Sequence, residues 1–224
     1  MEEYKIVEIK EDITSRNNEQ AKQIKKDLAE KKIFYLNVMA SPGSGKTTLI
    51  VQLVNRLKDR FRIGIIEADI DSDVDAKTIA DQTGVKVMQM HTGGACHITC
   101  QMSWDALVEL GIDDVDFVIL ENIGNLVCPA EFDTGATQNL VLLSVPEGDD
   151  KPLKYPLMFE VASVVALTKM DVAPAFDFDV EKAKKNIAYR NKDAKVFVTS
   201  AVKQEGIDEL CDYLTEQITK TTRI

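Results

Sequence analysis

The sequence predicts an α/β fold with a mostly parallel central sheet of about seven strands, covered by helices on both faces. One observation is that short β-branched apolar runs alternate with longer amphipathic stretches along the 224 residues. A second is that polar segments follow several of the apolar runs, at the sheet edge where parallel α/β proteins bind their ligands. A third is a phosphate-binding motif at the first of these junctions.

The predicted strands are apolar runs that are long enough to cross a sheet once and too short for independent helices. In chain order they span residues 33–40, 62–67, 85–90, 116–121, 140–145, 163–168 and 195–199. The predicted helices carry apolar residues at intervals of three and four positions, over residues 18–32, 46–60, 73–83, 99–110, 180–190 and 207–219. Strands and helices in regular succession indicate crossover connections, and therefore parallel pairing.

The composition excludes several classes of protein. With 45% hydrophobic residues the chain can bury one substantial core. No apolar stretch approaches the roughly 20 residues of a membrane span, and the charged start is unlike a signal peptide. We therefore expect no membrane association and a cytoplasmic location. A net charge of −10 with scattered Lys and Arg argues against nucleic acid as a partner.

The segment between the first predicted strand and the helix that follows it reads ASPGSGKTT over residues 40–48. This is a P-loop, in which successive backbone N–H groups and the following helix N-terminus cradle phosphate oxygens. The predicted fold is therefore that of a P-loop NTPase. Lys46 is expected to contact the β- and γ-phosphates, and the Thr47 hydroxyl to bind Mg²⁺. The expected nucleotide-binding residues of the loop are Gly43, Ser44, Gly45, Lys46, Thr47 and Thr48.

Two later strands end in segments that are similar to the guanine-reading elements of GTPases. The first reads TKMD over residues 168–171, and the second reads TSA over residues 199–201. The Asp171 carboxylate can accept two hydrogen bonds from guanine N1–H and the exocyclic amine, which adenine cannot supply. The Lys169 stem is expected to lie along the base, and a backbone N–H near Ala201 to meet the guanine carbonyl. Thr168 and Ser200 complete the predicted base-binding set.

Acidic residues after two central strands predict a Mg²⁺ site beside the P-loop. Asp69 and Glu121 follow buried strands, and Asp75 lies in the acidic segment after the first of them. With Lys46 and Thr47 they form the expected catalytic group. Gly124, just beyond Glu121, is expected at the γ-phosphate. We identify no water-positioning glutamine and no arginine finger, so unaided hydrolysis should be slow.

Four cysteines are too few and too unevenly spaced for a disulfide framework. Cys96 and His97 are adjacent, and Cys128 follows the segment that contains Gly124. Thiolate and imidazole ligands suit Ni²⁺ or Zn²⁺, and a two-fold dimer would pool enough of them for a complete site. Cys100, one helical turn beyond Cys96, is an additional candidate. The alternative for each cysteine is a small buried apolar residue, and Cys211 is expected to be one.

Together these segments resemble the HypB family of hydrogenase nickel-insertion GTPases, within the signal-recognition and MinD-like class of P-loop GTPases. The resemblance rests on ENIGNLVCP at residues 121–129, GGACH at 93–97, the Asp69 to Ala76 segment and VPEGDDKPLKYP at 145–156. It implies one GTPase domain over residues 33–224 with inserted metal-binding elements, preceded by a helical segment over residues 1–32 that packs on it. It also implies that Cys96, His97 and Cys128 bind the metal.

The function that the resemblance implies is that of a GTP-hydrolysing metallochaperone. It would assist nickel delivery to the large subunit of a nickel-iron hydrogenase, with GTP, Mg²⁺ and Ni²⁺ or Zn²⁺ as its ligands. The expected partners are a second copy in a GTP-dependent homodimer, a hydrogenase maturation protein and the hydrogenase large subunit. In the stiff basic segment over residues 150–156, Lys151 or Lys154 is expected to contact the nucleotide of the second copy, and the alternative is that the segment is a rigid surface loop. The alternatives are a nickel GTPase for another metalloenzyme, a small-metabolite kinase and a metal-sensing regulator.

Overall fold

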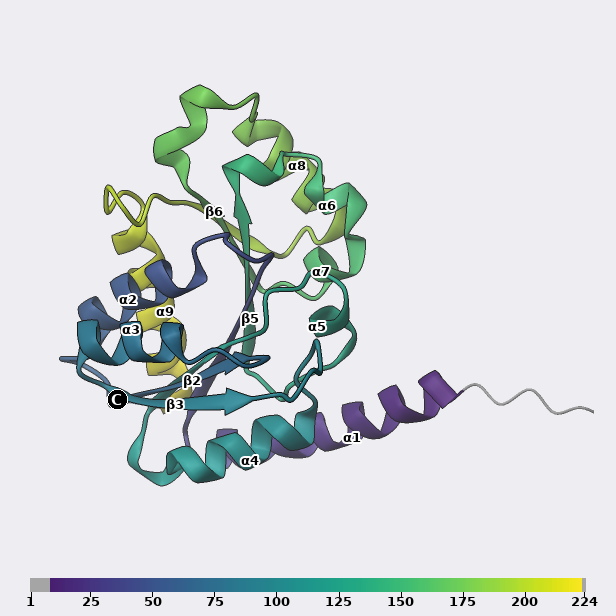
Figure 1. Ribbon diagram of the computed structural model, residues 1–224, viewed down its shortest axis with the longest axis vertical. Helices are drawn as coiled ribbons and strands as arrows, with labels where there is room; N and C mark the ends of the chain where they lie inside the picture. The colour runs from purple at the N-terminus through teal and green to yellow at the C-terminus, as the bar shows by residue number, and fades with distance from the viewer. Residues whose placement is uncertain (1–8, 223–224) are drawn as a thin grey trace, which may run out of the picture.

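The computed structural model describes residues 9–222, and it contains a seven-stranded sheet in the order β3-β2-β4-β1-β5-β6-β7 (Figure 1). Each pair of neighbouring strands is parallel. The strands are β1 (Phe34–Met39), β2 (Ile63–Asp69), β3 (Lys86–His91), β4 (Phe117–Glu121), β5 (Gln138–Ser144), β6 (Val164–Thr168) and β7 (Lys195–Val198). The predicted fold class is confirmed.

Six longer helices and three short ones accompany the strands within the described residues. The longer ones are α1 (Ile9–Glu30), α2 (Lys46–Leu57), α3 (Val74–Thr83), α4 (Cys100–Leu110), α8 (Val180–Arg190) and α9 (Ile207–Thr222). The short ones are α5 (Cys128–Glu131), α6 (Lys151–Lys154) and α7 (Pro156–Glu160). Three 3₁₀ segments, η1 (Ile112–Asp114), η2 (Val145–Glu147) and η3 (Met170–Ala175), complete the connections.

The largest differences between the observed and the predicted elements are at two places. Helix α1 begins at Ile9, well before residue 18. The prediction missed its first turns because they are polar and show little apolar periodicity. Helices α5, α6 and α7 are not among the predicted helices. They have 4, 4 and 5 residues and a proline in the first turn of each, which is too short to produce a periodic pattern.

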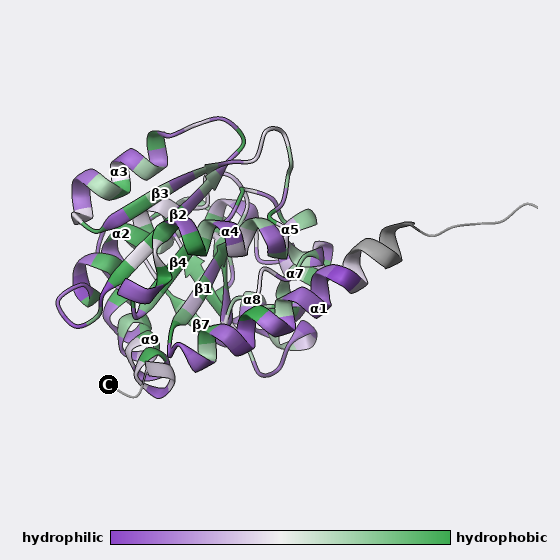
Figure 2. Ribbon diagram, turned by 90° about the horizontal axis from the view of Figure 1, so that it is seen from below, coloured by the Kyte–Doolittle hydropathy of each residue, from purple (hydrophilic) through white to green (hydrophobic). Residues whose placement is uncertain are grey.

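Helices cover both faces of the sheet, as predicted. Helices α2, α3 and α9 pack on one face, and α1 and α4 pack on the other over β1, β2 and β4, with α7 and α8 over β5 and β6 (Figure 1). Successive residues of β1 face opposite layers, since Leu36 joins the first core and Tyr35 the second. Apolar colour gathers in the sheet and polar colour on the outer sides of the helices (Figure 2).

The parallel arrangement brings the predicted site segments to one edge of the sheet. Because all seven strands run the same way, the segments after β1, β2, β4, β6 and β7 leave the sheet at its carboxyl edge. The domain boundary at residue 32 stays a prediction, and residues 1–8 of its N-terminal segment lie outside the described residues. Between residues 9 and 222, no helix has the length and apolar character that a membrane crossing requires.

Candidate functional site

The P-loop lies between β1 and α2, and its backbone requires glycine at two positions. Gly43 has φ 71° and Gly45 has φ 97°, in the left-handed region that glycine enters without strain. Gly45 is the N-cap of α2, so the unpaired N–H groups of the first helical turn face the loop. This geometry suits the binding of phosphate oxygens.

The loop after β4 approaches the P-loop closely at Gly124. A Cβ atom on Gly124 would lie 3.1 Å from the Cα, N and Cγ atoms of Pro42. Only glycine therefore fits without displacing the P-loop backbone. The contact places the residues after Glu121 directly beside the phosphate-binding loop.

The segments after β6 and β7 line a pocket of about 230 Å³ next to the P-loop. The Thr168 hydroxyl donates to the Ser44 carbonyl at 2.8 Å, and Lys169 Nζ donates to the Gly43 carbonyl at 2.6 Å. Lys169 has φ 60°, an uncommon value for a residue with a side chain. The pocket is lined by Ser44, Gly45, Thr48, Leu49, Thr168, Lys169, Asp171, Val172, Ala201 and Val202.

The carboxylate of Asp171 is fixed inside this pocket by a neighbouring hydroxyl. Ser200 Oγ donates to Asp171 Oδ1 at 2.7 Å, and this bond lowers the pKa of Asp171 below its usual value. The ionised carboxylate keeps its other oxygen for a ligand. A charged acceptor in the lining of this pocket fits a partner with two adjacent donors, as guanine has.

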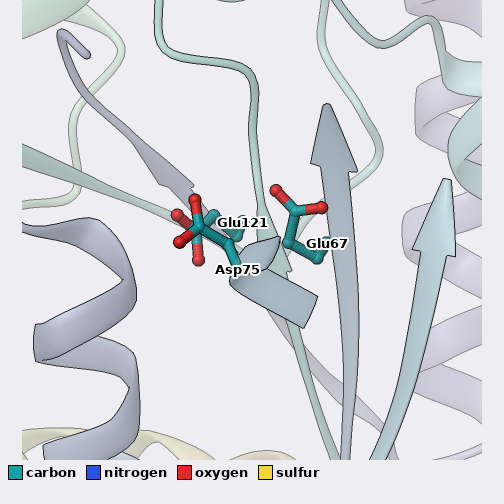
Figure 3. A group of neighbouring side chains, drawn as sticks. All are labelled: Glu67, Asp75 and Glu121. Carbon is teal, nitrogen blue, oxygen red and sulfur yellow. The ribbon is translucent and has the colours of Figure 1, made fainter. Parts of the chain in front are cut away.

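Three carboxylates meet beside the P-loop, and they include one that the sequence did not indicate. One ligand oxygen from each of Glu67, Asp75 and Glu121 lies within 4.8 Å of the others (Figure 3). Thr47 Oγ1 donates to Glu121 Oε1 at 2.9 Å, which joins the cluster to the P-loop. Glu67 and Glu121 are register partners in the neighbouring strands β2 and β4. A charged residue inside an otherwise apolar strand is the signal that could have identified Glu67.

Burial makes this acidic cluster a favourable site for a divalent cation. Burial raises the pKa of Glu67 to about 8 and that of Glu121 to about 7. Each of these two residues also has one buried carboxylate oxygen without a hydrogen-bond partner. Unpaired carboxylate oxygens are hard ligands of the kind that Mg²⁺ prefers.

Asp69, which we expected at the Mg²⁺ site, makes bonds to its own loop. Its Oδ1 accepts the backbone N–H groups of Asp71 and Ser72 at 3.0 and 2.7 Å, and these bonds lower the pKa of Asp69. Asp69 is the last residue of β2 and its carboxylate bonds to the turn that follows, whereas Glu67 lies two residues earlier in the strand and is the register partner of Glu121. The structure therefore groups Glu67, and not Asp69, with Asp75 and Glu121.

The predicted metal-binding cysteines lie face to face within a single chain. The Sγ atoms of Cys96 and Cys128 are 3.1 Å apart, and Cys96 Sγ lies 3.8 Å from His97 Nδ1. Cys96 is exposed and Cys128 is partly exposed. The hydrogen bond to Cys128 raises the pKa of the Cys96 thiol. Two thiols and an imidazole at the surface form a soft ligand set.

His97 and Cys100 differ sharply in their surroundings. The His97 ring stacks on Phe132 with centroids 3.9 Å apart, and burial lowers its pKa. Cys100 is 0% exposed in the core between α1 and α4, and burial raises its pKa to about 11. The additional candidate Cys100 is therefore not brought to the thiol pair. Its side chain packs as a small apolar residue, which is the alternative to a metal ligand that the sequence left open.

Lys154 lies outside the nucleotide pocket of its own chain. Its Nζ pairs with Asp150 Oδ2 at 2.7 Å, and its side chain is 59% exposed at the end of α6. Arg190 on α8 holds this short helix by donating to the carbonyls of Pro152 and Leu153. An exposed lysine on a fixed segment is free to exchange its partner for another anion.

The chain is similar to known proteins over nearly its whole length. Residues 34–198 match the family model described as CobW/HypB/UreG, nucleotide-binding domain. Hydrogenase maturation factor HypB of Escherichia coli (strain K12) is 41% identical over 217 residues, which cover 97% of this chain and 74% of that protein. Hydrogenase/urease maturation factor HypB of Helicobacter pylori is 39% identical over 217 residues, covering 95% and 88%.

Two solved structures have the same fold and related sequences. The crystal structure of HypB from Helicobacter pylori in complex with nickel matches with a TM-score of 0.84 and 36% identity, covering 92% of this chain and 97% of that one. HypB from Archaeoglobus fulgidus matches with a TM-score of 0.83 and 32% identity, covering 91% and 99%.

Proposed function

This chain belongs to the HypB family, and from that premise we propose that it is a GTP-hydrolysing metallochaperone that assists nickel delivery to the large subunit of a nickel-iron hydrogenase. The names of the Escherichia coli and Helicobacter pylori relatives support the maturation role, and the nickel complex supports the cargo. Thiol ligands need a reducing compartment, so the cytoplasm remains the location that we expect.

The observation that carries this proposal is a short connection between the phosphate-binding loop and the thiol pair. Gly124 packs on Pro42 of the P-loop, and Cys128 follows only four residues later. Between them, Asn125 Oδ1 accepts the N–H of Val127 at 2.9 Å, and Asn125 Nδ2 donates to the Cys96 carbonyl at 3.3 Å. A shift of this segment with the γ-phosphate would displace both thiol-bearing loops together.

The proposed nucleotide chemistry uses the residues of the P-loop and the acidic cluster. Lys46 would neutralise phosphate charge, and Asp171 would select guanine over adenine. Thr47 and Glu121, with Glu67 and Asp75 nearby, would hold Mg²⁺. When bound, Mg²⁺ neutralises charge on the β- and γ-phosphate oxygens.

A GTP-dependent homodimer would complete the thiol site, because one chain offers two thiols and one imidazole where Ni²⁺ or Zn²⁺ needs at least four ligands. Three exposed apolar side chains, one before α5, one on α6 and one on α7, support a contact with a second copy. Val127, Leu153 and Leu157 are 51%, 43% and 41% exposed. Lys154 lies with Val127 and Leu157 along one shallow pocket, where it could reach a nucleotide bound to the second copy.

The experiment that tests the function is nickel transfer in a purified system. The chain, loaded with Ni²⁺ and GTP, is incubated with a nickel-free hydrogenase large subunit, and the nickel content of the large subunit is measured after separation. We expect transfer that depends on GTP hydrolysis and that falls when GDP or a non-hydrolysable analogue replaces GTP. Equal transfer with GDP would contradict the proposal.

A second candidate function in the same class is nickel delivery to another metalloenzyme. The Helicobacter pylori relative, which carries the name hydrogenase/urease maturation factor, favours this alternative. Expression of the chain in a bacterium that lacks its own HypB, followed by separate assays of hydrogenase and urease, distinguishes the two. Restoration of urease alone would favour the second function.

A further inference from the structure

We propose that Asn17, on helix α1, is a positioning residue of the thiol site. Its buried side-chain amide joins the two segments that carry Cys96 and Cys128, so that α1 fixes the separation of the two sulfur atoms. The separation is a property of the fold, whereas the identity of the metal that the thiols take rests on the proposed function.

Asn17 uses both ends of its amide in one bridge. Its Oδ1 accepts the backbone N–H of Cys100 at 2.8 Å, and its Nδ2 donates to the backbone carbonyl of Asp133 at 2.8 Å. The residue is only 5% exposed, so water cannot readily replace either bond. Removal of the amide would leave a donor and an acceptor unpaired in the interior, which proteins rarely tolerate.

Each bond fixes one of the two thiol-bearing segments. Cys100 is the first residue of α4, and its N–H belongs to the helix turn that has no partner within the helix. Cys96 lies four residues earlier, on the loop that enters α4. Asp133 comes directly after α5 and its C-cap, and α5 begins at Cys128. Asn17 therefore pairs with the first N–H of α4, whose N-cap residue is Thr99, and anchors the end of α5 at the same time.

Other residues of α1 contact the segment around Asp133 and keep the helix in place beside it. Lys25 Nζ pairs with Asp133 Oδ2 at 2.5 Å. A Cβ atom on Gly135 would lie 2.7 Å from Cγ2 of Ile24, so the backbone passes directly under the helix. These contacts give the Asn17 bridge a fixed position from which to act.

Two further contacts join the segments at the exposed side of the site. They are the stack of His97 on Phe132 and the bond from Asn125 to the Cys96 carbonyl. Solvent reaches both, so each constrains the loops weakly. The Asn17 bridge is buried, and we expect it to contribute more to the 3.1 Å separation of the sulfur atoms.

The test uses the full chain in its metal-free form and the variant Asn17→Leu, which keeps the branching and the number of side-chain heavy atoms and removes both bonds. The first readout is cross-linking by dibromobimane, which becomes fluorescent when two nearby thiols displace its two bromides. The second is the Kd for Ni²⁺ alone. We expect the rate of cross-linking to fall and the Kd for Ni²⁺ to rise, each by about tenfold or more, which is the effect of losing other residues that orient metal ligands. The affinity for GTP should be unchanged.

A matched control separates positioning from general stability. Asn191→Leu removes three amide bonds, to the carbonyls of Glu160 and Ala162 and from the N–H of Asp193, and none of these residues lies on a thiol-bearing segment. It should leave cross-linking and Ni²⁺ affinity unchanged under conditions where urea unfolding shows both variants to be folded. Cys128→Ser should give no fluorescent product.

If Asn17→Leu cross-links and binds Ni²⁺ as the wild type does, or if Asn191→Leu has equal effects, the proposal is overturned. Should Asn17→Leu fail to fold, Asn17→Asp still accepts from Cys100 but cannot donate to Asp133, and wild-type cross-linking in that variant would overturn the proposal. If the wild type cross-links quickly but takes up no Ni²⁺, the proposed function fails, and cross-linking alone decides the role of Asn17.

Discussion

The nucleotide pocket and the thiol site are constructed differently, although they are only a few residues apart in the chain. The pocket is formed by segments that leave the carboxyl ends of β1, β6 and β7, and its contacts are short bonds such as that from Thr168 to Ser44. The thiol site lies on an exposed loop and on the four-residue helix α5, and contacts with α1 hold it. The difference teaches that the sheet itself positions the first site, while contacts between loops and α1 position the second.

The largest expected effect concerns the nucleotide pocket alone. Lys46→Ala should lower the rate of GTP hydrolysis by at least about 10²-fold, because it removes a positive charge from the phosphate site. The fold and the Ni²⁺ affinity of the nucleotide-free protein should be unchanged. Steady-state phosphate release is the measurement, with the exposed Lys77→Ala on α3 as the control. If the variant still hydrolyses GTP at the wild-type rate, the assignment of Lys46 to the phosphate site is wrong.

The specificity of the same pocket gives the next effect. Asp171→Asn should weaken GTP binding by about 10²-fold, since an amide cannot accept both guanine donors. Binding of xanthosine triphosphate should improve, because the new amide can donate to the xanthine C2 carbonyl. Competition with a fluorescent GTP analogue measures both. If wild-type GTP and ATP affinities are equal, the guanine assignment is wrong.

The thiol site should respond independently of the pocket. Cys128→Ala should weaken Ni²⁺ binding by about tenfold or more, while guanine specificity remains. Binding should also weaken as the pH falls, because the thiols must lose protons to bind metal. The raised pKa of Cys96 means that this loss begins at a higher pH than for an ordinary thiol. Titrations with Ni²⁺ at several pH values measure the effect of the variant and the pH dependence. The control is Cys211→Ala, because Cys211 lies on α9 and packs in the core.

The smallest expected effect is on stability and lies in the acidic cluster. In the folded state the pKa values of Glu67 and Glu121 are raised to about 8 and 7, above those of the unfolded chain. The stabilisation of the folded state by these two residues is therefore fully present below about pH 4.5 and is lost as the pH rises toward 8. We expect the free energy of unfolding without Mg²⁺ to fall over this interval, and Glu67→Gln to reduce that fall. Urea unfolding at pH 5 and pH 8 is the measurement, and a steeper fall in the variant would contradict it.

The sequence was sufficient for the parts that local motifs encode. The P-loop, the strands and the segment at residues 168–171 carry residue types whose role depends on their immediate neighbours. Glu67 escaped detection because its contact with Glu121 arises only when β2 and β4 align in register. Asn17 could not be identified either, since its two bonds join it to residues 83 and 116 positions away.

The thiol site illustrates the same limit. We expected a dimer to pool the cysteines, and the single chain already brings Cys96 and Cys128 within 3.1 Å. That approach depends on how two loops and α1 pack, which no spacing in the sequence reveals. Cys100 has the helical spacing of a ligand but lies in the core. The GTP-dependent dimer itself remains a prediction.

The central claim is that nucleotide state changes metal affinity through the segment from Gly124 to Cys128. The most direct measurement is equilibrium dialysis of Ni²⁺ with the wild type in the presence of a non-hydrolysable GTP analogue or of GDP, repeated with Cys128→Ala. We predict different Ni²⁺ affinities in the two nucleotide states, a GTP-analogue affinity that Ni²⁺ changes by the same factor, and loss of this coupling in the variant. Identical Ni²⁺ affinities in both states of the wild type would contradict the account.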